Sequence, residues 1–319
     1  MSEVAAGVYR LEAPLGEQFV CIFVVVGETS ALVVDTGVAS SPEATVGVLA
    51  RDLGVDISHV VVSHADVDHC GGISSMRAIA PGATVMCSRL DRPWIDSVEA
   101  LIDHRYREFR HEYDIDEDEE FLLWVLQNDD GGSVDAVVDP PLTVDLGGRT
   151  VELLRTPGHT RGHLTVLDPA TGTAIVADAV LAGATPNAAG IPAYAPTYRY
   201  VSDYRETISK LRDLAPEIML GSHFPAAEGA TQVRAFLDAS DAFVSDLEGA
   251  VEHAVERSGP LTVRDLIDLA APGVRSWPSA MDITLAGPVV GHLEDLTARG
   301  RLQRLPGIPA TFVREADGG

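Results

Sequence analysis

The stretch SHADVDHCGG, residues 63–72, decides the interpretation of the chain because it holds two histidines and two aspartates within six consecutive positions. The apolar run HVVV before it is typical of a buried strand, and Gly-Gly follows it, so the cluster lies where a strand ends and a helix begins. In such a loop His64 and Asp66 point the same way, whereas Asp68 and His69 sit at the helix start. The four side chains can therefore face two neighbouring metal ions, for which Zn²⁺, Fe²⁺ or Mn²⁺ would suit. A helix-capping Asp68 beside surface histidines would explain only one or two of them.

The composition indicates a globular protein of one large domain or two. The chain has 319 residues, of which 46% are hydrophobic. Its 23 basic and 48 acidic residues give a formal net charge of −25, which disfavours nucleic acid and anionic membranes as partners. The three cysteines form no CxxC pair, and neither a signal peptide nor a membrane-spanning run is recognisable. We therefore expect a cytoplasmic protein.

The hydrophobic pattern predicts a mixed α/β fold in which one arrangement of strands occurs twice. Strands are predicted in the first half from β-branched runs at 8–13, 19–27, 30–37 and 59–62, with a helix at 41–53. Strands return in the second half at 142–158, 163–180 and 217–223. The repetition predicts two sheets packed face to face with helices outside. Residues 91–135 are predicted to form inserted helices, and their acidic run at 114–120 to form a solvated face or a helix start.

A second module is predicted at the C-terminal end. We expect a catalytic domain at residues 1–237 and a helical module at 238–319, in which helices precede a short hairpin in the manner of a winged helix. Acidic residues outnumber basic ones in this module, so packing, capping or homodimer formation is favoured over DNA recognition.

Three further segments end a β run with a metal-ligand type. His159 follows the Pro-Gly turn of LLRTPGH, Asp178 ends the strand AIVAD, and His223 ends IMLGSH. If these strand ends meet at one edge, their side chains reach the loop of His64.

These motifs, in this order, resemble those of the metallo-β-lactamase superfamily, whose hallmark is HxHxDH, then a GH turn, an Asp at a strand end and a final His. VVDTG at 33–37 also resembles the early strand and turn of that family, and the resemblance covers about residues 7–235. It implies an αββα sandwich and two divalent metal ions. One ion would be held by His64, Asp66 and His159, the other by Asp68, His69 and His223, with Asp178 bridging. Asp68 and Asp178 are then the expected catalytic carboxylates.

Asp66 departs from the family pattern, which has a second histidine at this position. Two divalent ions carry about four positive charges; Asp68 and Asp178 lower the total to about two, and Asp66 lowers it to about one. At this lower charge the metal ions should be weaker Lewis acids, and the harder oxygen donor shifts the preference from zinc toward iron or manganese. His223 departs in a smaller way, because Phe-Pro rather than Gly follows it. His163 is interpreted as a supporting or structural residue rather than a ligand.

We expect the protein to hydrolyse an ester, thioester or lactone of a small molecule by means of a metal-held hydroxide. The negative charge argues against the RNA-cleaving branch of the family. A phosphodiesterase or nuclease activity is kept as a further alternative. A di-iron protein that reduces or activates oxygen is the alternative, since that branch also has a carboxylate at the position of Asp66. A non-catalytic binding module is the third.

Substrate recognition is expected from residues 91–135 and from the loop at 185–200. Tyr194, Tyr198, Arg199 and Tyr200 can meet a substrate there, although the same aromatic residues can equally anchor a proline-rich loop.

Overall fold

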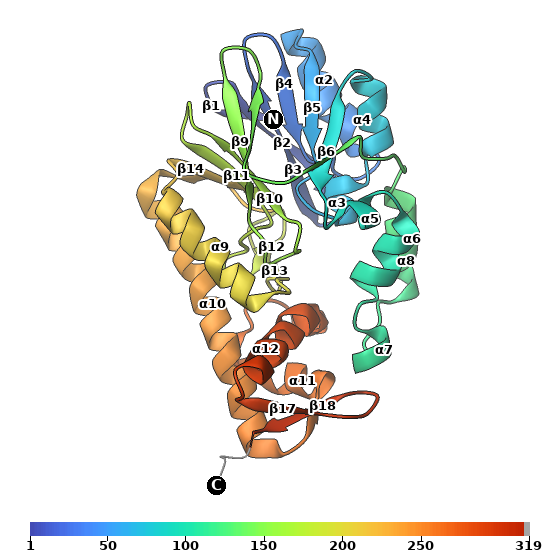
Figure 1. The fold of residues 1–319 in the computed structure, drawn as a ribbon, viewed down its shortest axis with the longest axis vertical. Coiled ribbons are helices and arrows are strands. Elements are labelled where there is room, and N and C mark those ends of the chain that lie inside the picture. Colours follow the sequence, from blue (N-terminus) through green and yellow to red (C-terminus); the bar gives the residue numbers. More distant parts are fainter. Residues whose placement is uncertain (316–319) are drawn as a thin grey trace.

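The computed structural model describes residues 1–315 of the chain. It has two large sheets, a set of inserted helices and a C-terminal helical module (Figure 1). None of the described helices is long and apolar enough to cross a membrane.

The first sheet has seven strands in chain order. They are β1 (Ser2–Ala5), β2 (Val8–Leu15), β3 (Gln18–Val26), β4 (Ala31–Val34), β5 (Ile57–Val61), β6 (Thr84–Ser88) and β7 (Ala136–Val138). The β3–β4 pair is antiparallel, and β4, β5 and β6 run parallel to one another. The carboxyl ends of these parallel strands therefore meet at one edge of the sheet.

The second sheet has six strands in the order β15-β14-β11-β10-β9-β8. Their bounds are β8 (Leu142–Asp145), β9 (Thr150–Arg155), β10 (Leu164–Asp168), β11 (Thr173–Ala177), β14 (Ile218–Gly221) and β15 (Ala227–Glu228). β11 and β14 are parallel, so their carboxyl ends also lie together. A short pair, β12 (Thr185–Pro186) and β13 (Pro192–Tyr194), lies between β11 and the next helix in the chain.

Three apolar cores hold the four layers together, one between the sheets and one between each sheet and its helices. Within β3, Phe23 and Val25 face the core between the sheets, together with Val166 and Ile175 of the second sheet. The alternate β3 residues, represented by Ile22, face the helical side. Because both faces of β3 are covered, its sequence is a continuous apolar run instead of an alternating one.

The outer layers are helical, which confirms the predicted αββα sandwich. On the first sheet lie α1 (Ser41–Ala44), α2 (Val46–Leu53), α3 (Val67–Cys70) and α4 (Ile73–Ile79). On the second lie α9 (Val201–Leu214) and α10 (Gly229–Ser258), along the opposite side of the molecule from α2 and α4 (Figure 1).

The expected insertion is present as a chain of short helices. They are α5 (Arg92–Ile95), α6 (Val98–Leu101), η1 (Ile102–Tyr106), α7 (Arg110–Tyr113) and α8 (Glu119–Asn128). η1 is a single π-helical turn, a form that often marks functional sites. The acidic run ends at the start of α8, where the Asp118 carboxylate accepts a hydrogen bond from the Phe121 amide, so the helix-start prediction is confirmed.

The C-terminal module consists of the second half of α10 and the elements that follow it. These are β16 (Leu261–Thr262), α11 (Val263–Val274), η2 (Ser279–Leu285), α12 (Ala286–Ala298), β17 (Leu302–Leu305) and β18 (Thr311–Arg314). The three strands pair in the order β16-β18-β17. The boundary placed at residue 237 from the sequence falls inside α10, which continues unbroken through it.

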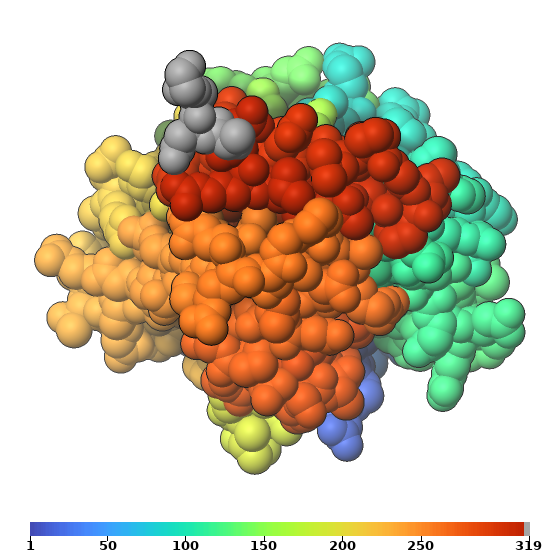
Figure 2. Space-filling view, turned by 90° about the horizontal axis from the view of Figure 1, so that it is seen from below, coloured from blue at the N-terminus to red at the C-terminus, as the bar shows by residue number. Residues whose placement is uncertain are grey.

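The module is packed against both the loop at 195–200 and the insertion. α12 approaches this loop so closely that a Cβ at Gly291 would lie 2.3 Å from the Arg199 carbonyl oxygen. The Glu112 carbonyl of α7 accepts a hydrogen bond from the Ala310 amide at 3.0 Å. Figure 2, seen from this end of the molecule, shows the module covering much of the face with the insertion at its border.

Candidate metal centre

Four loops bring the seven expected ligands together. Each loop follows a strand: β5 precedes the loop of residues 62–69, and β9, β11 and β14 precede the other three. The ligands are His64, Asp66, Asp68, His69, His159, Asp178 and His223. Parallel pairing of β4 with β5 and of β11 with β14 places these strand ends at neighbouring edges of the two sheets.

Six of these residues form two sets whose ligand atoms lie within 4.8 Å of one another in each set. The first set is His64, His159 and Asp178, and the second set is Asp68, His69 and His223. All six side chains are buried or nearly so.

Asp178 also faces the second set. Its Oδ2 lies 3.3 Å from His223 Nε2 and 3.7 Å from His69 Nε2. Asp68 Oδ2 lies 3.4 Å and 3.6 Å from the same two nitrogens. Ligands about 2.0–2.2 Å from one metal ion lie roughly 3.0–3.6 Å apart, so this spacing fits a shared ion. The geometry accommodates a carboxylate that serves both sets, as expected of Asp178.

The four histidines are held so that the same nitrogen faces inward in each. Each Nδ1 has an oxygen partner at 2.8–3.0 Å: Ser63 Oγ for His64, Asp35 Oδ2 for His69, the Thr197 carbonyl for His159 and the Phe19 carbonyl for His223. The Nε2 atoms of His64 and His69 and the Oδ1 of Asp178 are buried without a hydrogen-bond partner. Buried polar atoms without partners are rare, and a metal ion would satisfy all three. The residues therefore fit the implied metal ions.

The electrostatics of the cluster favour a bound cation. Burial alone would lower the pKa of His69, but the carboxylates of Asp68, Asp178 and Asp35 raise it to about 10. Burial would also lower the pKa of His223, which Asp178 and Asp68 raise to about 9. Carboxylates gathered around buried imidazoles thus attract positive charge, which protons or metal ions can supply.

Asp35 supports both sets, and the sequence analysis assigned it no role. Its Oδ2 accepts hydrogen bonds from His69 Nδ1 at 2.8 Å and from the Ser63 hydroxyl at 2.9 Å. That hydroxyl in turn lies 2.9 Å from His64 Nδ1. Asp35 is fully buried and has a φ of 66°. Its place in VVDTG, directly after a buried strand, was the available signal.

Asp91 is a second supporting residue that the sequence analysis missed. Its carboxylate accepts hydrogen bonds from the Ala65 amide, the Thr160 hydroxyl and the Gly162 amide. It therefore joins the loop of His64 to the loop of His159. No pattern in the sequence distinguishes it from other aspartates.

Asp66 is paired with an arginine of the insertion. Arg105 Nε lies 2.9 Å from Asp66 Oδ1, and Nη2 lies 3.1 Å from Oδ2. Asp66 Oδ2 also lies 2.8 Å from His159 Nε2 and 3.5 Å from His64 Nε2, so it borders the first set. Burial would raise the pKa of Asp66, but the guanidinium of Arg105 and the neighbouring imidazoles of His159 and His64 hold it well below its usual value.

Arg105 changes the charge expected from the sequence. The guanidinium adds one positive charge beside Asp66 and cancels the charge that the aspartate brings. The sequence-based total, which counted Asp66 without a partner, was therefore wrong by one. Arg105 lies 39 residues from Asp66, within a helical turn whose π form the sequence did not reveal.

The four expected substrate residues differ in accessibility. Tyr198 is fully buried, and its hydroxyl lies 2.8 Å from His292 Nε2. Arg199 is paired with Glu108 and Glu294, so a substrate would have to displace these contacts to reach it. Tyr194 and Tyr200 are partly exposed, and Tyr200 lies beneath the guanidinium of Arg161, with 4.6 Å between the Arg161 Cζ and the ring centroid.

His163 agrees with the interpretation from the sequence, and Cys70 and four further histidines lie outside both ligand sets. His163 is fully buried, stacks on His64 and contacts the Thr156 hydroxyl with its Nδ1. Cys70 packs in the core beneath the first sheet. The exposed histidines among them are His104, His111 and His253, whereas His292 is buried in the core.

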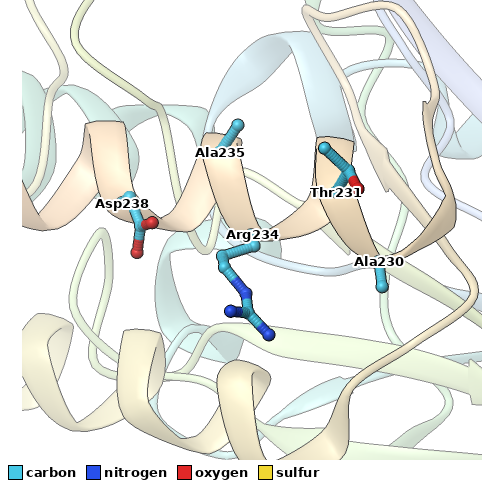
Figure 3. Close-up of a pocket in the computed structure, with 5 residues that line it drawn as sticks. All are labelled: Ala230, Thr231, Arg234, Ala235 and Asp238. Carbon is cyan, nitrogen blue, oxygen red and sulfur yellow. The ribbon is translucent and has the colours of Figure 1, made fainter.

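A hollow elsewhere on the surface contains none of the seven residues. It lies along the first turns of α10 and is lined by Ala230, Thr231, Arg234, Ala235 and Asp238 (Figure 3). Arg234 and Asp238 are the charged side chains in it, and the hollow is wide open to solvent.

Comparison with known proteins yields a family match and several similar structures. A sequence profile described as the metallo-beta-lactamase superfamily matches residues 15–223. A metallo-beta-lactamase family protein from Thermus thermophilus has a TM-score of 0.76 at 19% identity, covering 98% of this chain and all of the other. A beta-lactamase domain protein from Burkholderia ambifaria has a TM-score of 0.73 at 17% identity, covering 98% and 94%. At these identities the structures establish the fold alone, and the match includes the C-terminal helical region.

Proposed function

Because the chain belongs to the metallo-β-lactamase superfamily, we propose that it is a metal-dependent hydrolase of a small ester, thioester or lactone. The observation that supports this most is the convergence of four imidazole Nε2 atoms and the carboxylates of Asp68 and Asp178 at one buried point. When bound there, divalent metal ions would polarise the substrate carbonyl and acidify the attacking water.

The protein side chains have separate tasks in this proposal. The two sets hold the metal ions, and the Nδ1 contacts keep the imidazole rings in place. Asp178 faces both sets, so its carboxylate would help to hold the metal ions that acidify the attacking water. Asp68, whose side chain is 18% exposed, is the carboxylate that can accept a proton from this water. Tyr194 and Tyr200 are the more accessible of the expected substrate contacts.

The experiment combines metal analysis with substrate assays. Protein purified without added metal is measured for zinc, iron and manganese, and then assayed with thioesters, lactones and phosphodiesters. Asp68→Asn should lower hydrolysis by about 10²-fold or more. Asp246→Asn, on an exposed position of α10, is the matched control and should leave it unchanged. Absence of metal-dependent hydrolysis across the panel would contradict the proposal.

The nature of the metal is tested by the same measurement. Oxygen donation from Asp66 favours iron or manganese, whereas its pairing with Arg105 reduces the effect. Two zinc ions per chain with full activity would refute a preference for iron or manganese.

A di-iron centre that reduces oxygen is the second candidate, because Asp66 adds a carboxylate to the first set. It would show visible absorption that depends on iron and would consume oxygen in the presence of a reductant. Neither property is expected of the hydrolase.

Charge and packing support a proposal for the partners and the location. A net charge of −25 supports a small-molecule substrate instead of nucleic acid or an anionic membrane, and it is consistent with a cytoplasmic location. The order of helices and strands after residue 238 supports a winged-helix arrangement with a packing role or a role in forming a homodimer.

A further inference from the structure

Asp66 and Arg105 form a closed ion pair at the edge of the first set. Both guanidinium contacts are within hydrogen-bond distance, at 2.9 and 3.1 Å, and the side chains are only 14% and 13% exposed. Two parallel N–H···O bonds of this kind are among the strongest polar contacts in proteins. Asp66 stands at the N-cap position of α3, yet its carboxylate caps no amide of this helix. Its bonding capacity is therefore directed to Arg105 and to the first set.

Arg105 also contacts a ligand of the first set directly. His159 Nδ1 donates to the Thr197 carbonyl at 3.0 Å, which leaves Nε2 with a lone pair in the neutral ring. Asp66 Oδ2 lies 2.8 Å from this Nε2 and Arg105 Nη2 lies 3.2 Å from it, so the ion pair stands beside the nitrogen that a metal ion would need. The guanidinium remains charged at any pH at which the protein is folded.

The second set has no such neighbour. Among residues 1–315, the cationic groups within 4.0 Å of Asp68 and Asp178 are the imidazoles of His69 and His223. The carboxylates of this set are therefore available to a metal ion without competition from an arginine.

The neighbouring residue Tyr106 fixes the position of the helical turn that carries Arg105. The next residue, Tyr106, accepts a hydrogen bond from the Val67 amide with its hydroxyl at 2.9 Å. Its ring packs edge-on against Phe121 of α8, with 5.1 Å between the ring centroids. The turn η1 is thus anchored to the ligand loop on one side and to the insertion on the other.

We propose that the Asp66–Arg105 pair makes the two metal sites unequal, so that the second set binds its ion tightly and the first set binds a weakly held, exchangeable ion. The inference rests on the metal centre of the proposed function. The pair as a whole is neutral, as an imidazole at position 66 would be, but the arginine withdraws the carboxylate from the metal and repels the incoming cation. Arg105 is accordingly a positioning residue that controls the occupancy of the first set.

Metal binding itself tests this inference. The metal-free protein is titrated with Zn²⁺ and, separately, with Mn²⁺ against a chromophoric chelator, and the ions bound per chain are counted by elemental analysis. The wild type should bind in two steps whose affinities differ by about 10²-fold or more. Arg105→Met, which removes the charge and keeps the length, should strengthen the weak step by about tenfold and leave the tight step unchanged.

Asp66→His supplies the reciprocal test. With Arg105 retained, the histidine variant leaves an unpaired guanidinium beside the metal, so the weak step should become weaker by about tenfold or more. The double variant with Arg105→Met should bind both ions with similar affinity. The effects of the two substitutions are then not additive, as expected of residues that act as a unit.

Arg107→Met is the matched control, because Arg107 lies two residues along the chain and pairs with Asp116 at 3.2 Å. It should leave both steps unchanged. Arg105→Lys keeps the charge but loses the two-pronged contact. Its weak step should have an affinity between those of the wild type and Arg105→Met, and it replaces the methionine variant if that variant fails to fold. Equal steps in the wild type, or a weak step that Arg105→Met weakens or leaves unchanged, would overturn the inference. These titrations need no substrate, so failure of the proposed hydrolysis would be seen separately.

Discussion

The two ligand sets have nearly the same donors and differ in their surroundings. Each contains two imidazoles and a carboxylate, and all four rings are held through Nδ1. The first set is bordered by Arg105 from the insertion, whereas the described cationic groups within 4.0 Å of Asp68 in the second set are the imidazoles of His69 and His223. Inserted helices can therefore adjust one metal site of a pair while the fold that supplies the ligands is unchanged.

Asp178 is a member of the first set and also faces the histidines of the second, so its loss should have the largest effect. Asp178→Ala is expected to weaken both steps of metal binding and to lower hydrolysis by about 10³-fold or more. Chelator competition and the substrate panel measure these effects. If a single step were lost and the other kept its affinity, Asp178 would serve one set and not bridge the two.

Asp35 tests whether the two sets share a support. Asp35→Asn tolerates the positive φ but loses the charge that holds His69 and, through Ser63, His64. Metal affinity should fall by about 10–100-fold in both sets. Asp145→Asn, at the exposed last residue of β8, is a control that should leave affinity unaltered.

Asp91 should separate the sets, because it supports the first one alone. Asp91→Ala leaves the amides of Ala65 and Gly162 and the hydroxyl of Thr160 without their partner. We expect a loss of about 2–3 kcal/mol in the free energy of unfolding, together with a weaker first set and a second set that retains its affinity. Urea unfolding and metal titration give the two values, and equal weakening of both sets would contradict this assignment.

The C-terminal module provides a reference region that touches neither set. His292, Arg299 and Arg205 surround Glu248 and lower its pKa to about 2, from an ordinary 4.5. A lowered pKa means that Glu248 stabilises the fold fully above about pH 4.5 and that this contribution is lost as the pH falls toward 2.

Glu248→Gln should therefore destabilise the protein by about 1 kcal/mol at pH 7, and the difference from the wild type should shrink by pH 3. Urea midpoints at both pH values check this. The metal-binding steps at pH 7 should be unchanged, and a change there would show that the module influences the ligand sets.

The ligands could be predicted from the sequence because each one follows a strand whose pattern is local. The run before His64 and the run before Asp178 identify strand ends, and parallel strands bring their ends together by geometry alone. The four layers followed from the same patterns.

The partners of the ligands could not be predicted in this way. Arg105 reaches Asp66 only because a π turn and the contacts of Tyr106 place it there, and these depend on packing between distant segments. Tyr198 and Arg199 illustrate the same limit, since their contacts with His292 and Glu294 require a helix more than 90 residues away in sequence.

The continuity of α10 has a consequence for shortening the chain. Its 30 residues span about 45 Å as a rigid rod, with a buried apolar stripe from Val233 to Val255. The first part of this stripe covers the second sheet, and the later part forms the centre of the C-terminal module. Ending the chain at residue 237 would therefore cut through a helix that both regions share. The sandwich and the C-terminal module would each expose an apolar surface that the intact helix covers.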